Sequence, residues 1–441
     1  MTAGKVRDIP AGMTHATPAQ HAPSWYADSA NPHPAHPALA GDESCDVCVV
    51  GAGYTGLTTA LELAERGYSV IVLEAERVGW GASGRNGGQI ITGYNKPYSA
   101  MTRMMGEGDA RILWDLGEEA KSRLERRVTR HAIACDLTWG YLLAALKPRH
   151  MAELADLDAE LRGPCGYGHA RLIDAAEART VVDSPRIIGG LYDARSGHIH
   201  PLNYALGLAD AARAAGVRIF ENSRVVRLDT GANPVAETGR GRVRARFLVL
   251  AGNAYLGGLV PGLARMVMPV ATYIAATEPL GAERAESLLP GNAAVSDMNF
   301  VLNYFRRSPD HRLLFGGEVS YSGLDRPGLA RSLRAKMLRL FPHLAGVRLT
   351  HCWGGKVAIT VNRMPQIGRL SPTTCFAHGY SGHGVALSGM AGALMAEAID
   401  GTAGRFDVMA RIPHMAFPGG RLARTPALVL GMLWFRLRDL L

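Results

Sequence analysis

Three glycines in the first part of the chain have the spacing of a phosphate-binding turn. Gly51, Gly53 and Gly56 form a Gly-x-Gly-x-x-Gly pattern directly after the apolar run of residues 47–50. The first glycine permits a tight turn, the second leaves room for a pyrophosphate against the backbone, and the third lets a helix pack close to the strand. The helix that follows offers free N–H groups and a partial positive charge to the phosphates. This pattern predicts a dinucleotide-binding site.

The elements around these glycines meet the context that the pattern requires. Residues 47–50 predict a buried strand, residues 57–66 a helix, and residues 70–73 a second strand that ends at Glu74. A carboxylate at that place can accept hydrogen bonds from an adenosine ribose. No second pattern of this kind follows a predicted strand, because the stretch at residues 239–241 lacks the third glycine. One site leaves two alternatives: an NAD that is used directly, or a flavin that the organic substrate reduces.

Two further glycine-rich stretches favour the flavin. Residues 79–89 contain enough glycine for the loop to lie flat against a ligand. In this loop, Ser83 offers a hydroxyl to a phosphate, and Asn86 with the amides that follow it can reach a polar ring edge. Residues 378–385 precede a predicted helix at residues 388–399. A helix N-terminus there would stabilise the negative charge of a reduced isoalloxazine. NAD enzymes do not need the loop at residues 79–89.

The composition narrows the class of protein. A chain of 441 residues that is 47% hydrophobic and 20% charged suits a globular protein of two or more domains. No apolar stretch has the length of a membrane span, and the N-terminus lacks the apolar core of a signal peptide, so we expect a cytoplasmic location. The six scattered cysteines fit a reducing compartment.

Two kinds of partner are not expected. The net charge is +9, yet no basic block carries interleaved aromatic residues, so the sequence does not favour nucleic-acid binding. Core positions explain Cys45 and Cys48 better than a shared metal does, and the early histidines are irregularly spaced in a Pro-rich segment. We therefore expect no metal site and a small-molecule substrate.

The predicted elements indicate a discontinuous binding domain. Helices are expected at residues 109–130, 206–215 and 388–399, and strands at residues 217–220, 225–228, 243–250, 268–277 and 300–305. Because the nucleotide-associated strands are spread over the chain, a second domain is expected to be inserted between them. The predicted boundaries are an extended N-terminal arm at residues 1–40, an FAD-binding domain at residues 41–95, 185–265 and 352–405, a substrate domain at residues 96–184 and 266–351, and a C-terminal tail at residues 406–441 that packs on the body. The apolar group at residues 24–26 is expected to dock the arm.

The motifs resemble those of the D-amino-acid-oxidase-type FAD oxidoreductases, which include glycine, sarcosine and amine oxidases. The resemblance extends over nearly the whole chain from about Ser24, and its motifs are residues 49–57, 81–90, 197–203, 363–369, 381–385 and 417–420. It implies an α/β fold in which a discontinuous Rossmann-like FAD-binding domain carries an inserted antiparallel-sheet substrate domain of the α+β kind. Residues 197–203 and 417–420 also resemble a branch that oxidises gamma-glutamylputrescine, which we expect as the lead substrate.

The resemblance implies roles for the residues at matching positions. The pyrophosphate, ribose, adenine and ring contacts would come from Gly51, Gly53, Tyr54, Thr55, Gly56, Glu74, Ala75, Gly81, Ala82, Ser83, Arg85, Asn86, Gly87, Gly88, Gln89, Val225, Ala251, Gly252, Gly379, Gly382, His383, Gly384 and Val385. Some relatives link FAD covalently through a cysteine. Here Ile359 occupies the nearest position and Cys352 lies several residues earlier, so non-covalent FAD is expected.

The implied reaction is the oxidation of an amine. Hydride transfer from the carbon next to nitrogen to flavin N5 gives an imine, water releases an aldehyde and ammonia, and O2 reoxidises the flavin with formation of H2O2. The alternative keeps the fold but makes the protein an amine or amino-acid dehydrogenase that passes electrons to a quinone or another acceptor. The apolar piece at residues 426–435 invites that alternative, although it is too short to span a bilayer.

The sequence indicates the substrate-binding residues less clearly than the cofactor-binding residues. Tyr273, Tyr304, Phe305 and Trp353 are candidate walls of the substrate cavity, although each also suits an ordinary core position. His383 and Tyr304 are the candidate catalytic residues, and no obligatory base is expected. Arg306 is a candidate for binding a substrate carboxylate. The oligomeric state is left open.

Overall fold

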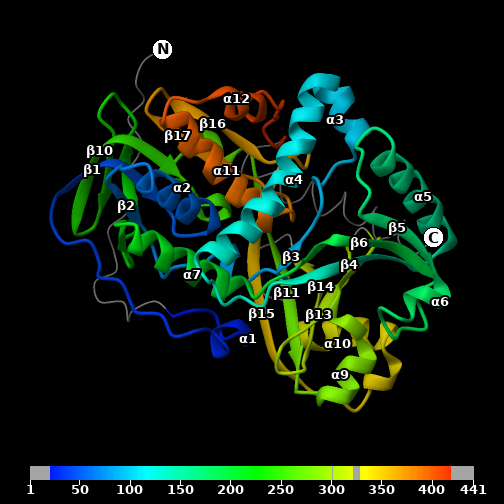
Figure 1. The fold of residues 1–441 in the computed structure, drawn as a ribbon. Helices are drawn as coiled ribbons and strands as arrows, with labels where there is room; N and C mark the ends of the chain where they lie inside the picture. Colours follow the sequence, from blue (N-terminus) through cyan, green and yellow to red (C-terminus); the bar gives the residue numbers. More distant parts are fainter. Residues whose placement is uncertain (1–19, 300, 321–327, 419–441) are drawn as a thin grey trace.

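Two β-sheets, each accompanied by helices, make up the molecule (Figure 1). The computed structural model describes residues 20–299, 301–320 and 328–418. The first part of the predicted N-terminal arm and most of the predicted C-terminal tail, with the apolar piece at residues 426–435, lie outside the described residues. In the described part of the chain, no helix is both long and apolar enough to cross a membrane.

The first sheet contains the two strands that flank the glycine pattern, the strands predicted at residues 217–220, 225–228 and 243–250, and three strands that the sequence pattern did not predict. Its order is β16-β17-β10-β1-β2-β7, and β8 and β9 extend it beside β10. Neighbouring strands from β17 to β7 are parallel, whereas β16 is antiparallel to β17. The bounds are β1 (Glu43–Val50), β2 (Val70–Leu73), β7 (Arg218–Phe220), β8 (Val225–Asp229), β9 (Val235–Thr238), β10 (Gly241–Leu250), β16 (Gln366–Ser371) and β17 (Thr374–His378). The core of this sheet is buried on both faces, which explains the uninterrupted apolar runs.

Successive side chains of β1 point to opposite faces of this sheet. Val47 and Val49 pack with the helices α2 (Tyr54–Ala64) and α11 (Gly384–Ile399), while Cys48 and Val50 pack on the side of β8 and β9. Helices α4 (Glu107–Arg130) and α7 (Pro201–Ala214) complete the helical layer by contacting α11 and α2 respectively. Helix α11 is apolar and buried almost all round, as expected for a helix between other layers.

Charged side chains tie three of these helices together. Glu62 of α2 accepts a hydrogen bond from Arg127 of α4 at 2.8 Å, and Arg123 of α4 reaches Glu397 of α11 at 3.1 Å. Burial raises the pKa of Glu62 and the neighbouring arginines lower it, and the net result is a lowered pKa. These ion pairs join the last turns of α2 and α11 to α4, while the first turns of α2 and α11 reach the cavity described below.

The second sheet is larger and mostly antiparallel. Its order is β15-β11-β14-β13-β12-β4-β6-β3, with β5 beside β6, and only β12 and β4 run parallel. The bounds are β3 (Gln89–Ile90), β4 (Thr138–Ala145), β5 (Ala170–Asp174), β6 (Gly189–His198), β11 (Met268–Thr277), β12 (Ala294–Asp297), β13 (Tyr304–Arg307), β14 (Leu313–Ser320) and β15 (Leu349–Ile359). The remaining helices are α1 (Trp25–Asp28), α3 (Tyr98–Met105), α5 (Pro148–Arg162), α6 (Ala175–Ala178), α8 (Pro261–Ala264), α9 (Ala282–Leu288), α10 (Leu329–Leu340) and α12 (Gly404–Ala410).

The pairing of three strands differs from the predicted division into domains. The predicted FAD-binding ranges include β3, β6 and most of β15, yet all three strands pair within the second sheet. Assigning domains by sheet would therefore move these strands to the substrate side. The boundaries themselves stay a prediction.

Several helices begin earlier than the sequence pattern predicts. Helix α7 starts at Pro201 because proline is favoured in the first turn and His200 Nδ1 accepts a hydrogen bond from the backbone N–H of Asn203. Helix α11 starts at Gly384, inside the stretch that the sequence suggests is loop. The predicted strand at residues 268–277 coincides with β11, whereas β13 begins only at Tyr304.

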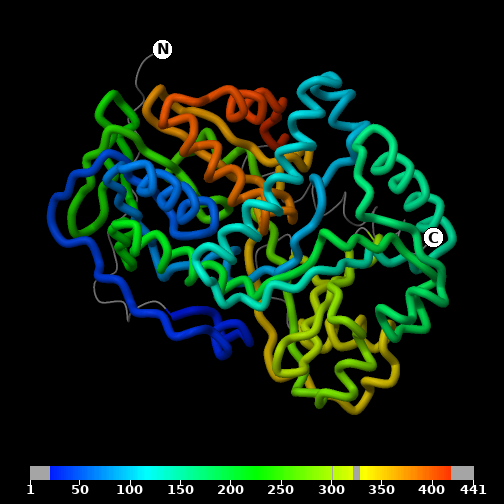
Figure 2. Tube along the Cα trace, viewed as in Figure 1, coloured from blue at the N-terminus to red at the C-terminus, as the bar shows by residue number. Residues whose placement is uncertain are grey.

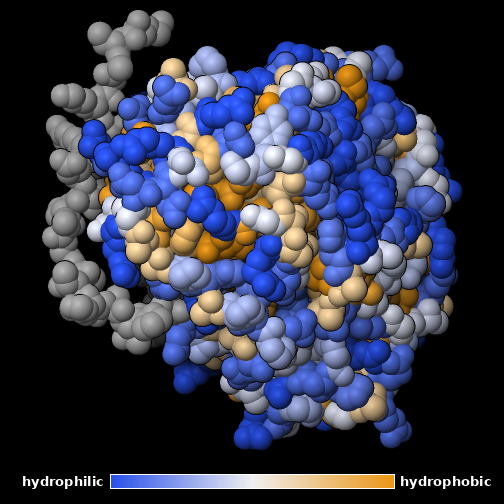
Figure 3. Space-filling view, turned by 60° about the vertical axis from the view of Figure 1, so that its left-hand side comes forward, coloured by the Kyte–Doolittle hydropathy of each residue, from blue (hydrophilic) through white to orange (hydrophobic). Residues whose placement is uncertain are grey.

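The described part of the N-terminal arm runs along the outside of both sheets (Figure 2). Trp25 and Tyr26 in α1 are buried at 4% and 0% exposure, which confirms that this apolar group docks the arm. The space-filling view shows a largely hydrophilic face with apolar side chains gathered near its centre (Figure 3).

Candidate active site

A cavity of about 810 Å³ opens where β1, β2 and β10 end and α2 begins. This is the edge at which open α/β sheets bind ligands. Gly51 has φ +109°, which favours glycine, and a Cβ on Gly56 would lie 1.9 Å from the carbonyl oxygen of Gly51. A Cβ on Gly53 would instead point at the cavity and lie 2.8 Å from Ser83 Oγ. The first and third glycines thus shape the turn, and the second keeps the cavity open.

Two helix N-termini reach this cavity without a side-chain cap. Helix α2 has Gly53 at its N-cap and α11 has His383, and neither cap residue accepts a hydrogen bond through its side chain. Ser83 Oγ accepts from the backbone N–H of Tyr54 at 3.1 Å. In the described part of the chain, Ser388 Oγ is buried at the cavity wall and has no hydrogen-bond partner. Amide donors and a spare hydroxyl suit the phosphates of a dinucleotide.

Glu74 stands at the other end of the cavity. Its Oε2 accepts from the backbone N–H of Ala52 at 2.7 Å, and its Oε1 accepts from that of Glu76 at 2.9 Å. Burial raises the pKa of this carboxyl, partly offset by the two amide donors. Each oxygen keeps a further lone pair, so Glu74 can accept from a ribose hydroxyl. Ala75 and Val225 line the same end.

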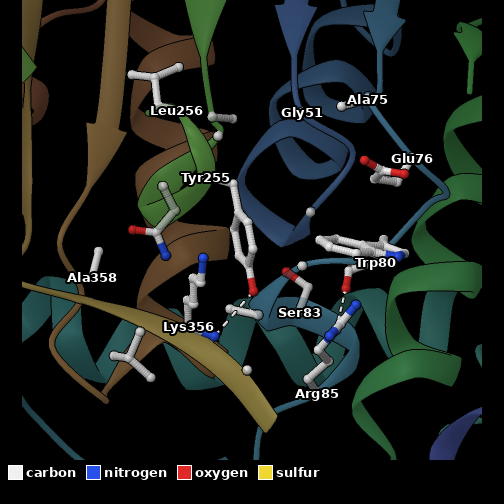
Figure 4. Close-up of a pocket in the computed structure, with 18 of the residues that line it drawn as sticks. Gly51, Ala75, Glu76, Trp80, Ser83, Arg85, Tyr255, Leu256, Lys356 and Ala358 are labelled. Atoms are coloured by element: carbon white, nitrogen blue, oxygen red, sulfur yellow. Dashed lines mark hydrogen bonds between the residues drawn. The ribbon is translucent and has the colours of Figure 1, made fainter. Parts of the chain in front are cut away.

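Sequence reasoning missed three residues in the middle of this cavity (Figure 4). The Arg85 guanidinium lies over the face of the Trp80 ring, with its central carbon 4.1 Å from the ring centroid, and Arg85 Nε donates to the Trp80 carbonyl at 2.7 Å. Tyr255 accepts through its hydroxyl from the backbone N–H of Lys356 at 3.1 Å. Trp80 could have been found within the glycine-rich loop, and Tyr255 just after Ala251-Gly252. Lys356 carries no local signal.

A second cavity, of about 710 Å³, adjoins the first. Both cavities are lined by Ala82, Arg85, Asn86, Gly355, Lys356, Val357, Gly382 and Val385. The second cavity continues past Gly87, Gln89, Tyr304 and His383 toward β4 and β6. Most of the predicted phosphate residues therefore line the first cavity, and the predicted ring residues Asn86, Gly382 and Val385 line both cavities where they meet.

A buried carboxylate, Asp193 of β6, belongs to the second cavity. Its Oδ1 accepts from the Tyr167 hydroxyl at 2.7 Å, and its Oδ2 accepts from the hydroxyls of Thr92 and Ser196 at 2.6 Å each. Lys121, buried on α4, donates to both the Thr92 and the Tyr167 hydroxyls. Donors on both oxygens satisfy the buried charge of Asp193. No local pattern in the sequence indicates this group, because its members are far apart in the chain.

The candidate catalytic residues both line the second cavity. Burial lowers the pKa of His383 to about 4, so its imidazole is neutral at physiological pH. Burial raises the pKa of Tyr304, which therefore stays a neutral phenol. The catalytic role of both residues stays a prediction.

The proposed substrate-binding residues are distributed differently from the prediction. Tyr304 lines the second cavity, but Tyr273 and Trp353 line the first. Phe305 and Arg306 line neither cavity, contrary to the prediction that they contact the substrate. Phe305 points to the opposite side of β13, where it stacks on Phe315 with centroids 5.9 Å apart. Arg306 is 1% exposed and donates to the carbonyl of Gly87 and the hydroxyl of Tyr26.

Most of the predicted cofactor residues line one of the two cavities. The exceptions are Gly56, Gly88 and Gly379, which permit close packing next to them. Gly379, for example, has φ +76° and its N–H donates to Asn253 Oδ1. Ile359 lines the second cavity and Cys352 the first. The individual cofactor contacts stay predictions, but the amide donors, the uncapped helices and the glycine-lined passage fit an FAD.

Comparisons with known proteins agree with this geometry. A family model described as FAD dependent oxidoreductase (DAO) matches residues 46–398. The gamma-glutamylputrescine oxidoreductase of Escherichia coli is 43% identical over 95% of this chain and 99% of the relative. A probable oxidoreductase, OrdL, of Haemophilus influenzae is 40% identical over 95% of this chain and 98% of the relative. The glycine oxidase structure from Geobacillus kaustophilus shares the fold, with a TM-score of 0.69 and 23% identity over 81% of this chain and 95% of that one. The chain is therefore a member of the DAO family of FAD-dependent oxidoreductases.

Proposed function

We propose that this enzyme oxidises a primary amine at the end of a long, polar, acylated chain, with gamma-glutamylputrescine as the lead substrate. The Escherichia coli relative, which covers nearly the whole chain at 43% identity, bears that substrate in its name. The predicted subfamily motif at residues 197–203 agrees with this assignment. We also propose O2 as the electron acceptor.

The observation on which the proposal rests is the junction of the two cavities. The first cavity has the features of a dinucleotide site, and the second opens from it past Asn86, Gly87 and Gln89. An organic substrate in the second cavity can therefore reach the ring end of the cofactor directly. A separate nicotinamide site is not needed in this arrangement.

The charges of the second cavity suit a substrate that is cationic at its inner end. Asp193, Asp297 and Glu318 line it and are at most 7% exposed. The lysines that line it, Lys96 and Lys356, are exposed. The buried carboxylates favour an amine over an anionic group inside this cavity, and the exposed Lys96 favours a carboxylate near the opening, whereas Lys356 lies at the junction of the two cavities. Gamma-glutamylputrescine has an amine at one end and a carboxylate at the other.

Bound FAD would supply the hydride acceptor. The chain's own residues orient the substrate and limit water, because Tyr304 and the walls of the second cavity hold the carbon next to nitrogen toward the junction. The amine must reach this place unprotonated, and His383, neutral at physiological pH, is the titratable side chain at the start of α11 that faces the second cavity. Loss of hydride from the substrate gives an imine, and water then releases the aldehyde and ammonia.

An anaerobic titration tests the proposed substrate. The holoenzyme is mixed without O2 with gamma-glutamylputrescine, putrescine, glycine, sarcosine or a D-amino acid, and the visible flavin absorbance is followed. We expect gamma-glutamylputrescine to bleach the flavin with the highest ratio of reduction rate constant to dissociation constant. A small amino acid giving the highest value would refute the substrate, although not the family.

Readmission of air tests the acceptor. We expect O2 consumption and one H2O2 per amine oxidised, with no requirement for NAD(P)H. Efficient reduction of a quinone or dye, together with negligible peroxide, would instead identify a dehydrogenase.

A further inference from the structure

A short N-terminal segment reaches the cofactor cavity from outside the family match. We call residues 20–31 the docking segment. The family model matches residues 46–398, so the docking segment lies outside it. Nevertheless Ala22 and Pro23 line the first cavity together with the glycines after β1. A part of the cavity wall is thus supplied by residues that the family pattern does not include.

The docking segment makes its first link to the cavity through Trp80. The Trp80 indole Nε1 donates to the carbonyl of Gln20 at 3.0 Å. Trp80 also packs edge-to-face against Tyr255, with centroids 5.7 Å apart. Trp80, Tyr255 and Arg85, which stacks on Trp80, all line the first cavity. The segment therefore helps to fix an aromatic wall in the middle of that cavity.

Its second link reaches the junction of the two cavities through Arg306. Tyr26 is fully buried, and its hydroxyl accepts from Arg306 Nη2 at 3.2 Å. Arg306 Nε in turn donates to the carbonyl of Gly87 at 2.9 Å. A Cβ on Gly88 would lie 3.3 Å from the Arg306 guanidinium, so the loop at residues 87–88 rests on this side chain. The orientation of that loop therefore depends on Arg306, and Arg306 is oriented by Tyr26.

Further polar contacts anchor the docking segment to two parts of the molecule. Trp25 Nε1 donates to Asp310 Oδ2 at 3.2 Å, in the loop before β14. Ser29 Oγ pairs with His200 Nε2 at 3.1 Å, and the backbone N–H of Asn31 donates to Asn203 Oδ1 at 2.8 Å at the start of α7. The buried rings of Trp25 and Tyr26 add apolar contacts to this docking. The segment is thus a fixed wall and not a loose tail.

We propose that the docking segment is a cofactor-retaining element. It closes one side of the first cavity at Ala22 and Pro23, and through Tyr26 and Arg306 it positions the Gly87 carbonyl beside the predicted ring site. This role adds residues to the FAD site that the dinucleotide fingerprint does not contain, and it is independent of which amine is oxidised.

Two shortened chains and two point variants test the proposal by cofactor affinity, without any amine. One shortened chain lacks residues 2–31, and its matched control lacks residues 2–19, which leaves every contact above in place. Apoprotein of each is titrated with FAD, the Kd is taken from flavin fluorescence, and far-UV circular dichroism checks the fold. We expect at least a tenfold weaker Kd for the first chain and an unchanged Kd for the second.

The point variants decide the question if the shorter chain does not fold. Tyr26→Phe keeps the buried ring and removes only the acceptor for Arg306, so we expect a Kd for FAD that is about five-fold weaker, the effect of one hydrogen bond. Asp28→Ala is its control, because Asp28 lies in the same short helix and pairs with His351 on the outside. An unchanged FAD affinity in Tyr26→Phe, or in a folded chain without residues 2–31, would overturn the proposal.

Discussion

Replacing Gly53 with alanine separates the phosphate role of this glycine from a structural one. Gly53 has φ −90° and ψ −176°, a conformation that alanine adopts without strain. Its added Cβ would meet only the end of a side chain, Ser83 Oγ, at 2.8 Å. Gly56→Ala, in contrast, would place a Cβ 1.9 Å from a backbone oxygen and should prevent correct folding. We therefore expect Gly53→Ala to fold and to bind FAD weakly.

The expected magnitude follows from the contacts that the methyl group would displace. A hydrogen bond between an amide and a charged group contributes about 1.5–3 kcal/mol. If the methyl group keeps the pyrophosphate from one backbone N–H at the start of α2, the Kd for FAD should rise by roughly 10- to 150-fold. The assay is titration of the apoprotein with FAD, followed by flavin fluorescence. Gly108→Ala is the matched control, because a Cβ at that helical position meets nothing within 4 Å.

The same substitution in a Ser83→Ala background tests the alternative cause. If Gly53→Ala acts by pushing Ser83 Oγ aside, it should have little further effect once that oxygen is gone. If it acts on the phosphate, the loss of affinity should persist in the double variant. A folded Gly53→Ala protein that binds FAD as tightly as the wild type would refute the phosphate assignment.

Three further outcomes are expected. Acid denaturation should release free FAD equally from the wild type and from Cys352→Ser, because Ile359 stands where some relatives have the linking cysteine. Flavin that stays with the denatured wild-type chain, but not with denatured Cys352→Ser, would show a covalent link. Burial, with the nearby charge of Arg306, lowers the pKa of His198 and His200 to about 3, so only the unfolded chain takes up these protons below about pH 6.5. The free energy of unfolding should therefore fall by roughly 2–3 kcal/mol per pH unit from these two groups as the pH drops from about 6 to 4. Urea unfolding of a His198→Gln/His200→Asn variant should show a shallower dependence on pH. Asp193→Asn should lower the free energy of unfolding by about 1–3 kcal/mol, because an amide nitrogen cannot accept from the hydroxyls that face it. The same variant should raise the KM for the amine, and a KM equal to that of the wild type would contradict the proposed role of Asp193 as a buried anion of the substrate cavity.

The cofactor half of the site could be predicted because its information is local. The turn at Gly51–Gly56 needs glycine for steric reasons that act within a few residues, and β1, α2 and β2 follow one another directly in the chain. The apolar runs have the period of buried strands and helices, so these elements were placed within a few residues. Even the start of α11 differed only because its first turn consists of residues that are also common in loops.

The substrate half could not be predicted in the same way, because strand orientation decides it. Tyr304, Phe305 and Arg306 are consecutive in β13, so Tyr304 and Phe305 must face opposite sides of the sheet. Tyr304 faces the second cavity because its ring lies over Gly316 of β14, where a Cβ would come within 2.1 Å of it. That pairing joins two strands whose register the sequence does not reveal. The aromatic pattern alone was therefore consistent with either face.

Arg306 shows how a correct chemical expectation can be assigned to the wrong partner. Its guanidinium does bind oxygen acceptors, as its residue type predicts, but those acceptors are the Gly87 carbonyl and the Tyr26 hydroxyl. At 1% exposure it is shielded from any substrate. A buried arginine with fixed partners holds a loop more rigidly than a lysine would, because its planar donors are already oriented. Arg306 therefore contacts the loop at residues 87–88 and not the substrate. Substrate specificity must then depend on side chains that line the second cavity, among them Asp193 and Tyr304.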